Sequence, residues 1–580
     1  MLPLTHSKIQ RISVWFLCVA LLVAWLLPYR TYPYGSFYND YVSVLGVVCG
    51  LLCVCGTRSR DQIDIPACAW LPLAIAGWIS CQALFAQLAY RTDAILPLGY
   101  LVAASGAAVL GATSRSANIR SLSDDFPHLL IASAILIAAC LSAFISFFQY
   151  LGIDRLLGDW SVAIDGDGKT AVQPYANLGR PDQLALLLCW ALAALWSLIQ
   201  RRWLNGVSGC IFALVLLTSL AFTQSKIAWL IVPAFVALVA WANRRSWARR
   251  VPATMLVGLT LYFIAVVLLL PALTQFSGIA TDGVDQHPTL NSVRMVMILQ
   301  GFLIGVQHPL AGVGWLGFPA HQIVVASQFG ETPFAMHAHN LIANLSAELG
   351  WIATAAILAA TAYWLFINFV KTSTDARRHF ALMVFVAVGV HSMFGLPLWY
   401  AYVLLPVFFI AGFVETTRKE ARRIVVQRGP VLAIVLIGAA ALALIASDYR
   451  GVVQGFRALG YERLGWTYAE GSTERPELTV FPQFYDYFAF ADVRPTSGIT
   501  PQQMVAYERV EKRFGSAAVM MRMAIIYGLN GRPDDAVATM DVMRHLDRQR
   551  YLEAYRAWEE MSRAGPDVLG KIYARLTPPS

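Results

Sequence analysis

The chain has 580 residues, a formal net charge of +9, 57% hydrophobic residues and only 14% charged residues. Soluble proteins carry about 25% charged residues, so this composition excludes an ordinary soluble protein. It predicts an all-α, polytopic membrane protein, because a bilayer admits apolar helices whose backbone groups are bonded internally.

Apolar runs of membrane-spanning length recur up to residue 447. A helix of roughly 17–25 apolar residues crosses the hydrocarbon core, and by this measure we expect about thirteen transmembrane helices. The first should be retained, because no small-residue cleavage site follows it. The expected spans are 12–28, 40–56, 66–88, 94–112, 128–150, 182–199, 206–222, 227–242, 252–271, 340–370, 380–396, 398–415 and 430–447.

Basic residues gather in alternate loops between these spans. If the spans alternate, every basic cluster lies on one side, which the positive-inside rule makes cytoplasmic. The net charge is therefore a topology signal, and no motif indicates nucleic-acid binding. The clusters are Lys8 and Arg11; Arg58 and Arg60; Arg115 and Arg120; Arg201 and Arg202; Arg244, Arg245, Arg249 and Arg250; Lys371, Arg377 and Arg378; and Arg418, Lys419, Arg422, Arg423 and Arg428.

The opposite, outer side receives the larger loops and the tail. We expect a membrane domain over 1–447 with a large outer loop over 272–339, and a helical outer domain over 448–580. In the tail, helices are expected at about 501–514 and 516–530, before a break at Gly531-Arg532-Pro533 and two more helices. Such helix pairs resemble tetratricopeptide hairpins, and an ordinary small helical domain is the alternative.

The large outer loop ends on two histidines, His337 and His339, directly before the span that starts at Leu341. Histidine is the side chain that most readily exchanges a proton near neutral pH, so both are candidate catalytic residues. The alternative is a pair of interfacial histidines that cap a helix.

Cations recur on the outer side, where topology disfavours positive charge. Lys226 lies in a very short outer turn, Arg294 near the end of the large loop, and His391 before an aromatic segment; Arg91 and Arg180 are also outer. This pattern favours a membrane-level site for a phosphate-bearing lipid. A snorkelling lysine and a loop-anchoring arginine are the structural alternatives.

These segments resemble the O-antigen ligase/polymerase superfamily, and within it the bacterial O-linked protein oligosaccharyltransferases. The resemblance covers roughly residues 150 to 560. The matching motifs are Tyr-Ala-Asn-Leu-Gly-Arg-Pro-Asp-Gln at 175–183, Pro-Leu-Ala-Gly-Val-Gly at 309–314, His-Ala-His-Asn-Leu at 337–341, Glu-Leu-Gly at 348–350, His-Ser at 391–392 and Pro-Leu-Trp-Tyr-Ala-Tyr at 397–402.

Three departures from the family pattern bear on donor geometry and glycan preference. Lys226 follows Ser225 where the family usually has arginine, which keeps the charge but loses the bidentate fork. Gly395-Leu396 replaces an acidic–aromatic pair, and Arg180 and Asp182 replace a glutamine and an asparagine.

The resemblance implies an inverting glycosyltransferase of the bacterial inner membrane with a periplasmic active site, no cofactor and no metal. A preassembled oligosaccharide would pass from undecaprenyl diphosphate to a Ser or Thr hydroxyl of a pilin-like or other periplasmic protein. His339 would act as general base, with His337 beside it. Arg294 and Lys226 would bind the diphosphate, and His391, Arg180 and Arg91 would complete the lipid or glycan site.

Two alternatives stay open. An O-antigen ligase or polymerase would use the same chemistry on lipid A-core or on a saccharide hydroxyl, although the motif at 175–183, the motif at 391–402 and the helical tail favour protein acceptors. A lipid or sugar transporter is a different class. It is disfavoured because no clear internal repeat occurs and the polar groups gather at the outer surface.

Overall fold

The chain is mostly helical. Eight of the described helices are long and apolar enough to cross a membrane, which agrees with an all-α, multi-pass membrane protein; the number thirteen stays a prediction. The basic loops at 57–60, 114–125 and 417–422 lie outside the described residues. The computed structural model describes residues 6–56, 61–85, 87–113, 126–162, 173–245, 248–276, 288–329, 332–372, 375–416, 423–463, 471–492 and 494–579.

The chain divides into two compact units, and each is described by itself. Both units are assembled from segments that are far apart in the sequence. The first unit combines Met1–Ala76, Gly99–Gln286 and Ala359–Leu444, and the second combines Gly77–Leu98, His287–Leu358 and Ile445–Ser580.

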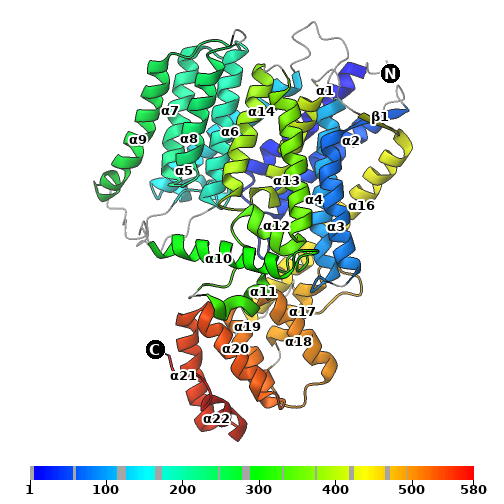
Figure 1. Cartoon of the computed structure of the whole chain (residues 1–580), viewed down its shortest axis with the longest axis vertical. Coiled ribbons are helices and arrows are strands. Elements are labelled where there is room, and N and C mark those ends of the chain that lie inside the picture. The colour runs from blue at the N-terminus through cyan, green and yellow to red at the C-terminus, as the bar shows by residue number, and fades with distance from the viewer. Residues whose placement is uncertain are drawn as a thin grey trace. The chain divides into compact units, whose positions relative to one another are not determined.

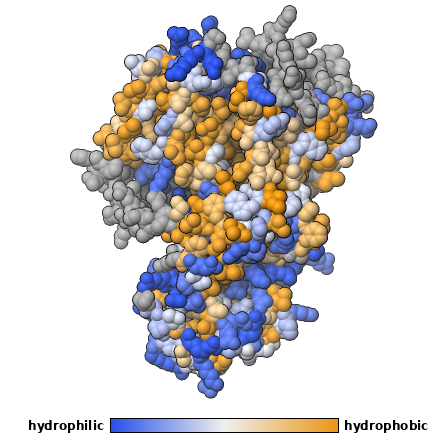
Figure 2. Space-filling model, in the orientation of Figure 1, coloured by the Kyte–Doolittle hydropathy of each residue, from blue (hydrophilic) through white to orange (hydrophobic). Residues whose placement is uncertain are grey.

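The first unit contains most of the long apolar helices. Within it, α6 packs against α5, α7, α8 and α14, and Figure 1 shows α6 to α9 running alongside one another. Figure 2 shows mainly hydrophobic side chains over this bundle. The elements are α1 (His6–Leu26), α2 (Phe37–Cys55), β1 (Gln62–Pro66), α4 (Ile95–Thr113), α5 (Phe126–Tyr150), α6 (Pro181–Gln200), α7 (Gly206–Phe222), α8 (Ala228–Ala242), α9 (Ala253–Phe276), α14 (Ala376–Ser392), α15 (Ala401–Glu415) and β2 (Arg423–Gln427).

Two buried carboxylates fix helix starts in the first unit. Asp40 in α2 accepts a hydrogen bond of 2.6 Å from the backbone N–H of Ala401, the first residue of α15. Glu415, at the other end of α15, accepts from the N–H groups of Ala67 and Cys68, just before α3 (Trp70–Leu84). Each carboxylate accepts from backbone N–H groups at a helix start that have no partner inside that helix. It therefore lies at the positive end of the dipole of the helix whose start it caps. β1 pairs antiparallel with β2 in a two-stranded sheet.

The second unit contains helices that lie inside the outer loop expected over 272–339. These are α10 (Pro288–Gln307) and α11 (Phe318–Val325), so much of this segment is regular structure. The span expected at 340–370 is divided, because α12 (Leu341–Leu349) ends at Gly350 and α13 (Trp351–Leu365) follows. Gly350 has a φ of 85°, which glycine adopts without steric cost and which ends the helix.

The tail forms the helices expected from its sequence. The predicted helices at 501–514 and 516–530 and the break at Gly531-Arg532-Pro533 are confirmed, whereas the tetratricopeptide likeness stays a prediction. α16 (Arg428–Arg463) continues beyond the expected end at 447. Figure 2 shows hydrophilic and hydrophobic side chains mixed over the last helices. They are α17 (Pro482–Asp492), α18 (Pro501–Phe514), α19 (Ala517–Leu529), α20 (Pro533–Leu546), α21 (Arg548–Ala564) and α22 (Asp567–Tyr573).

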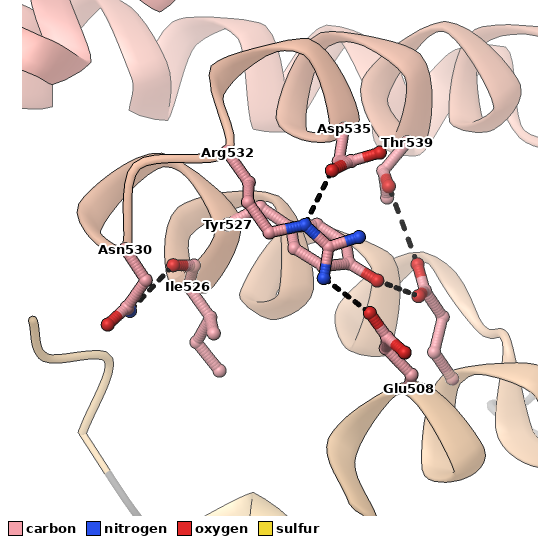
Figure 3. A network of polar contacts seen from close by, with 8 residues as sticks. Glu508, Ile526, Tyr527, Asn530, Arg532, Asp535 and Thr539 are labelled. Atoms are coloured by element: carbon pink, nitrogen blue, oxygen red, sulfur yellow. Dashed lines mark hydrogen bonds and ion pairs between the residues drawn. The ribbon is translucent and has the colours of Figure 1, made fainter. Parts of the chain in front are cut away.

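A polar network joins α18, α19 and α20 (Figure 3). Arg532 forms ion pairs of 2.5 Å with Glu508 and 2.6 Å with Asp535. Tyr527 and Thr539 donate hydrogen bonds to the two carboxylate oxygens of Glu511. Burial is the main cause that raises the pKa of Glu511 from 4.5 to about 7.

This shift predicts a pH-dependent stability. Between pH 4.5 and about 7 the folded protein keeps a proton on Glu511 that the unfolded chain has released. The contribution of this group to stability is therefore lost as the pH rises through 7. We expect the Glu511→Gln variant to melt at a temperature that depends less on pH than that of the wild type.

Fluorescence-monitored melting of the purified protein between pH 4 and 8 measures this difference. The control is Glu553→Gln, because Glu553 is 53% exposed in its pair with Arg550 and its substitution should leave the pH dependence unchanged. If the melting temperature of Glu511→Gln depends on pH as strongly as that of the wild type, Glu511 is not the group whose raised pKa causes the dependence.

Candidate active site

The two predicted catalytic histidines form a tight turn before α12. The backbone N–H of His339 donates a hydrogen bond of 3.2 Å to Nδ1 of His337, and the ring centroids lie 4.2 Å apart. His339 has a φ of 54°, in the left-handed region that few residues other than glycine adopt. Asn340 caps α12 by accepting from the N–H of Ala343. Both imidazoles are half-buried, and the turn is fixed by its own backbone and by this cap.

Helix α10 packs against this turn through Gly301 and against α12 through Gly305. A Cβ on Gly301 would lie 2.8 Å from Cβ of Ala338, and one on Gly305 would lie 2.9 Å from the backbone of Ser346. The order of these contacts shows that α10 and α12 run in the same direction. Arg294 precedes Gly301 by seven residues, so helical periodicity puts it on the same face, toward the end where the histidine turn lies. Its side chain is exposed.

The Pro309–Gly314 motif meets the end of α12. The N–H groups of Val313 and Gly314 donate to the carbonyls of Ala347 and Glu348. Gly312 has a φ of 67°, and a Cβ there would overlap the backbone of Glu348. The terminal carbonyls of α12, which have no partner inside the helix, are thus satisfied by a loop that only glycine allows to approach.

Gln82 of α3 closes the same junction. Its Nε2 donates to the carbonyls of Ala311 and Glu348, at 2.8 Å each, and its Oε1 accepts from the N–H of Trp315. One buried amide therefore holds both the motif loop and the end of the helix that follows the histidines.

The first unit gathers a second set of predicted residues around the start of α6. Asp182 accepts a hydrogen bond of 2.5 Å from Oγ of Ser225, the residue before Lys226. Arg180 is the N-cap of α6. Asp182 and Arg180 both lie close enough to the buried His391, in the last turn of α14, for charge interactions with its imidazole. Lys226 and Arg180 are exposed. The structure thus brings Arg180, Lys226 and His391 into one cluster.

The loop before this cluster is held by buried amides and by Arg30. Oε1 of Gln149 accepts from the N–H groups of Tyr175 and Ala176, and Asn177 donates to the carbonyls of Leu26 and Trp160. Nε and Nη2 of Arg30 donate to the carbonyl of Asn177. Burial lowers the pKa of Arg30, and a partly desolvated guanidinium attracts an anion more strongly than one in water.

Comparisons with known proteins find two family models and two relatives that resemble this chain. A family model described as O-Antigen ligase matches residues 211–358, and one described as Virulence factor membrane-bound polymerase, C-terminal, matches 379–563. The General O-oligosaccharyltransferase of Acinetobacter baylyi is 24% identical over 450 residues, covering 74% of each chain. The ComP-specific O-oligosaccharyltransferase of the same organism is 23% identical over 400 residues, covering 68% of this chain and 69% of that one. The chain is therefore similar to O-antigen ligases over one segment and to two O-oligosaccharyltransferases over more than two thirds of its length.

The two family-model matches include most of the predicted site. Lys226, Arg294, His337 and His339 lie in the segment matched as O-Antigen ligase, and His391 lies in the segment matched as the polymerase C-terminal part. His337, His339 and Arg294 belong to the second unit, together with the exposed Arg91 at the start of a 3₁₀ turn. Lys226, Arg180 and His391 belong to the first unit.

Several residues that support the candidate site were not predicted from the sequence. Arg30 could have been found, because it is a further cation in the outer loop over 29–39. Gln82, Gly301 and Gly305 carry no such signal, since a glutamine or a glycine within an apolar run is equally typical of an ordinary membrane helix.

Proposed function

We propose that the protein transfers a preassembled oligosaccharide, as one block, from undecaprenyl diphosphate to Ser or Thr hydroxyls of periplasmic proteins such as pilins. The observation that carries this proposal is the turn at His337 and His339, held against the helix that bears Arg294, in a segment similar to O-antigen ligases. The names of the two relatives support transfer of glycan to protein.

In this proposal His339 is the general base. Nδ1 of His337 accepts the N–H of His339, so a neutral His337 carries its proton on Nε2 and presents a donor there. His339 takes the proton of the acceptor hydroxyl as its oxygen attacks the anomeric carbon. The bond from that carbon to the diphosphate oxygen breaks with inversion, and undecaprenyl diphosphate leaves with the bonding electron pair.

The cations stabilise this leaving group without a metal or a cofactor. Arg294 and Lys226 neutralise the charge that develops on the diphosphate, and fixed positive charge is most effective where charge develops in the transition state. Arg180, Arg91 and His391 bind the rest of the donor. The departures at Lys226 and Arg180 change the geometry of these contacts but keep the positive charge.

The proposal also includes the cellular location of the protein and its division into domains. The basic loops are cytoplasmic, so the histidine turn and the tail are periplasmic at the inner membrane. Residues 1–447 form the membrane glycosyltransferase domain with its large periplasmic loop over 272–339, and 448–580 form a periplasmic, tetratricopeptide-like domain.

The test is co-expression with a lipid-linked glycan pathway and a pilin-like acceptor, followed by intact-protein mass measurement. We expect a mass gain of one complete oligosaccharide on the acceptor, and none in cells that lack the lipid-linked glycan. An unmodified acceptor together with new glycan on lipid A-core, or with longer polymer, would overturn protein transfer in favour of a ligase or polymerase. The descriptions of the two family models support these as the second candidates.

A further inference from the structure

We propose that the C-terminal helices position the histidine turn for the transfer step, with Phe334 and Gln322 as the positioning residues. This rests on the proposed role of His339 as general base. The tail would then act on the chemical step itself, in addition to any part it has in meeting an acceptor protein.

Gln322 clamps the segment that leads into the turn. It lies in α11 and is fully buried; its Oε1 accepts a hydrogen bond of 2.8 Å from the N–H of Ala335, and its Nε2 donates to the carbonyl of Pro333. The same Nε2 donates to Oε1 of Gln300 in α10, which is also fully buried. The residues on both sides of Phe334 are therefore tied to α11, and through Gln300 to the helix that bears Arg294.

Phe334 itself packs into the core of the C-terminal helices. It contacts this core together with Ile323 of α11, and a Cβ on Gly515 would lie 3.1 Å from Cε2 of Phe334 and 2.8 Å from Cδ1 of Ile323. The N–H of Thr332 donates to the carbonyl of His545 at the end of α20. We call these contacts of Thr332, Phe334 and Gly515 the seam.

The helix arrangement agrees with the seam. α11 packs against α18 and α20, and Figure 1 shows α11 beside the first helices of the tail. Ala326, directly after α11, is 2% exposed and belongs to the same core. Part of the core of the C-terminal helices is therefore supplied by α11 and by the segment that leads from it to the histidines.

A buried ion pair fixes the seam from its other side. Nε of Arg513 lies 3.0 Å from Oδ2 of Asp93, and the two side chains are 4% and 3% exposed. Arg513 lies two residues before Gly515, and Asp93 lies in the segment whose Gln82 holds the end of α12. A buried pair of this kind adds little net stability, but its geometry is specific.

Only Ala335 and Met336 lie between Phe334 and His337, and Ala335 is 7% exposed. Ala338 is fully buried against α10, so the turn is fixed on both flanks and has little room to absorb a displacement. A misplacement of 1 Å in a catalytic group can cost about 10²-fold in rate. Loss of the seam should therefore reduce turnover.

The two possible roles of the tail predict different kinetic effects. A surface that only recruits the acceptor contributes equally to the ground state and the transition state, so its loss raises KM for the protein acceptor and leaves kcat unchanged. Loss of positioning lowers kcat and leaves KM nearly unchanged.

The experiment compares Phe334→Ala and Gln322→Leu with wild type in the full-length purified protein, using the lipid-linked donor and a pilin-like acceptor. We expect kcat to fall by about tenfold to 10²-fold in both variants, with KM for the acceptor nearly unchanged. Phe334→Leu should recover much of the rate, because it restores an apolar side chain at the seam.

Leu569→Ala is the matched control. Leu569 is 4% exposed in the same C-terminal core but lies in α22, away from the seam, so its loss destabilises the core without displacing Phe334. A wild-type kcat in Phe334→Ala, or an equal fall of kcat in Leu569→Ala, would overturn the positioning role. If wild type modifies a saccharide acceptor and no protein, the proposed acceptor fails, and the same kcat comparison on the saccharide still decides on positioning.

Discussion

The His339→Ala variant should lose glycan transfer by about 10²–10⁴-fold, which is the typical loss when a general base is removed. A serine or threonine hydroxyl is a weak nucleophile that needs a nearby base. His339 is the candidate for that base, because Nδ1 of His337 is already used to accept the backbone N–H of His339. The measurement is initial transfer rate to the pilin-like acceptor at equal amounts of membrane-inserted protein.

The left-handed backbone at His339 complicates this substitution, since alanine tolerates a φ of 54° poorly. Asparagine adopts this region more readily but cannot act as the base at neutral pH. His339→Asn should therefore lose as much activity as His339→Ala. Near-wild-type transfer by His339→Asn would remove His339 from the role of base and leave it a backbone role alone.

The Gly312→Ala variant should lose transfer to a similar extent, for a reason of packing. A Cβ at residue 312 would overlap the backbone of Glu348, and the φ of 67° costs about 1–2 kcal/mol for a residue with a side chain. To relieve the overlap, the loop must separate from α12, which breaks the bonds from Val313 and Gly314 to the carbonyls of Ala347 and Glu348.

Protein level, melting temperature and transfer rate should be measured together for Gly312→Ala. The matched control is Gly258→Ala, since Gly258 lies in α9 with nothing within 4 Å of an added Cβ and alanine favours helix there. A Gly312→Ala protein with wild-type rate and melting temperature would show that the loop does not support the histidine turn.

The sequence predicts those elements of the fold that depend on the residues of one short segment alone. Long apolar runs, the helices of the tail and the break at Gly531-Arg532-Pro533 follow from hydropathy and helix-end signals. The approach of residues 309–314 to the end of α12 at Gly350 does not, because it joins two segments that no local signal relates to each other.

The candidate site shows the same limit. His337, His339 and Arg294 could be named from position and family likeness, and the structure sets Arg294 on the helix that packs against the histidine turn. Other contacts of the site join segments that are up to 420 residues apart, so only the folded chain brings them together. They are the contacts of Gln322, those of Gly515 and the pair of Asp93 with Arg513. Hydropathy alone cannot tell such a buried amide or arginine from one in a surface loop.

The membrane helices and the tail are held by different forces. In the most apolar stretches of Ala253–Leu270 and Arg428–Tyr461 only 11% and 6% of the residues are buried in protein, which leaves the others open to the acyl chains of a bilayer. Between helices within lipid there is no hydrophobic driving force, and their association depends on close van der Waals packing of small residues. The core around Trp558 and Tyr551 is instead driven together by water, a force that weakens on cooling. Cold therefore loosens the core that supports Phe334 while leaving the lipid-embedded packing largely unaffected.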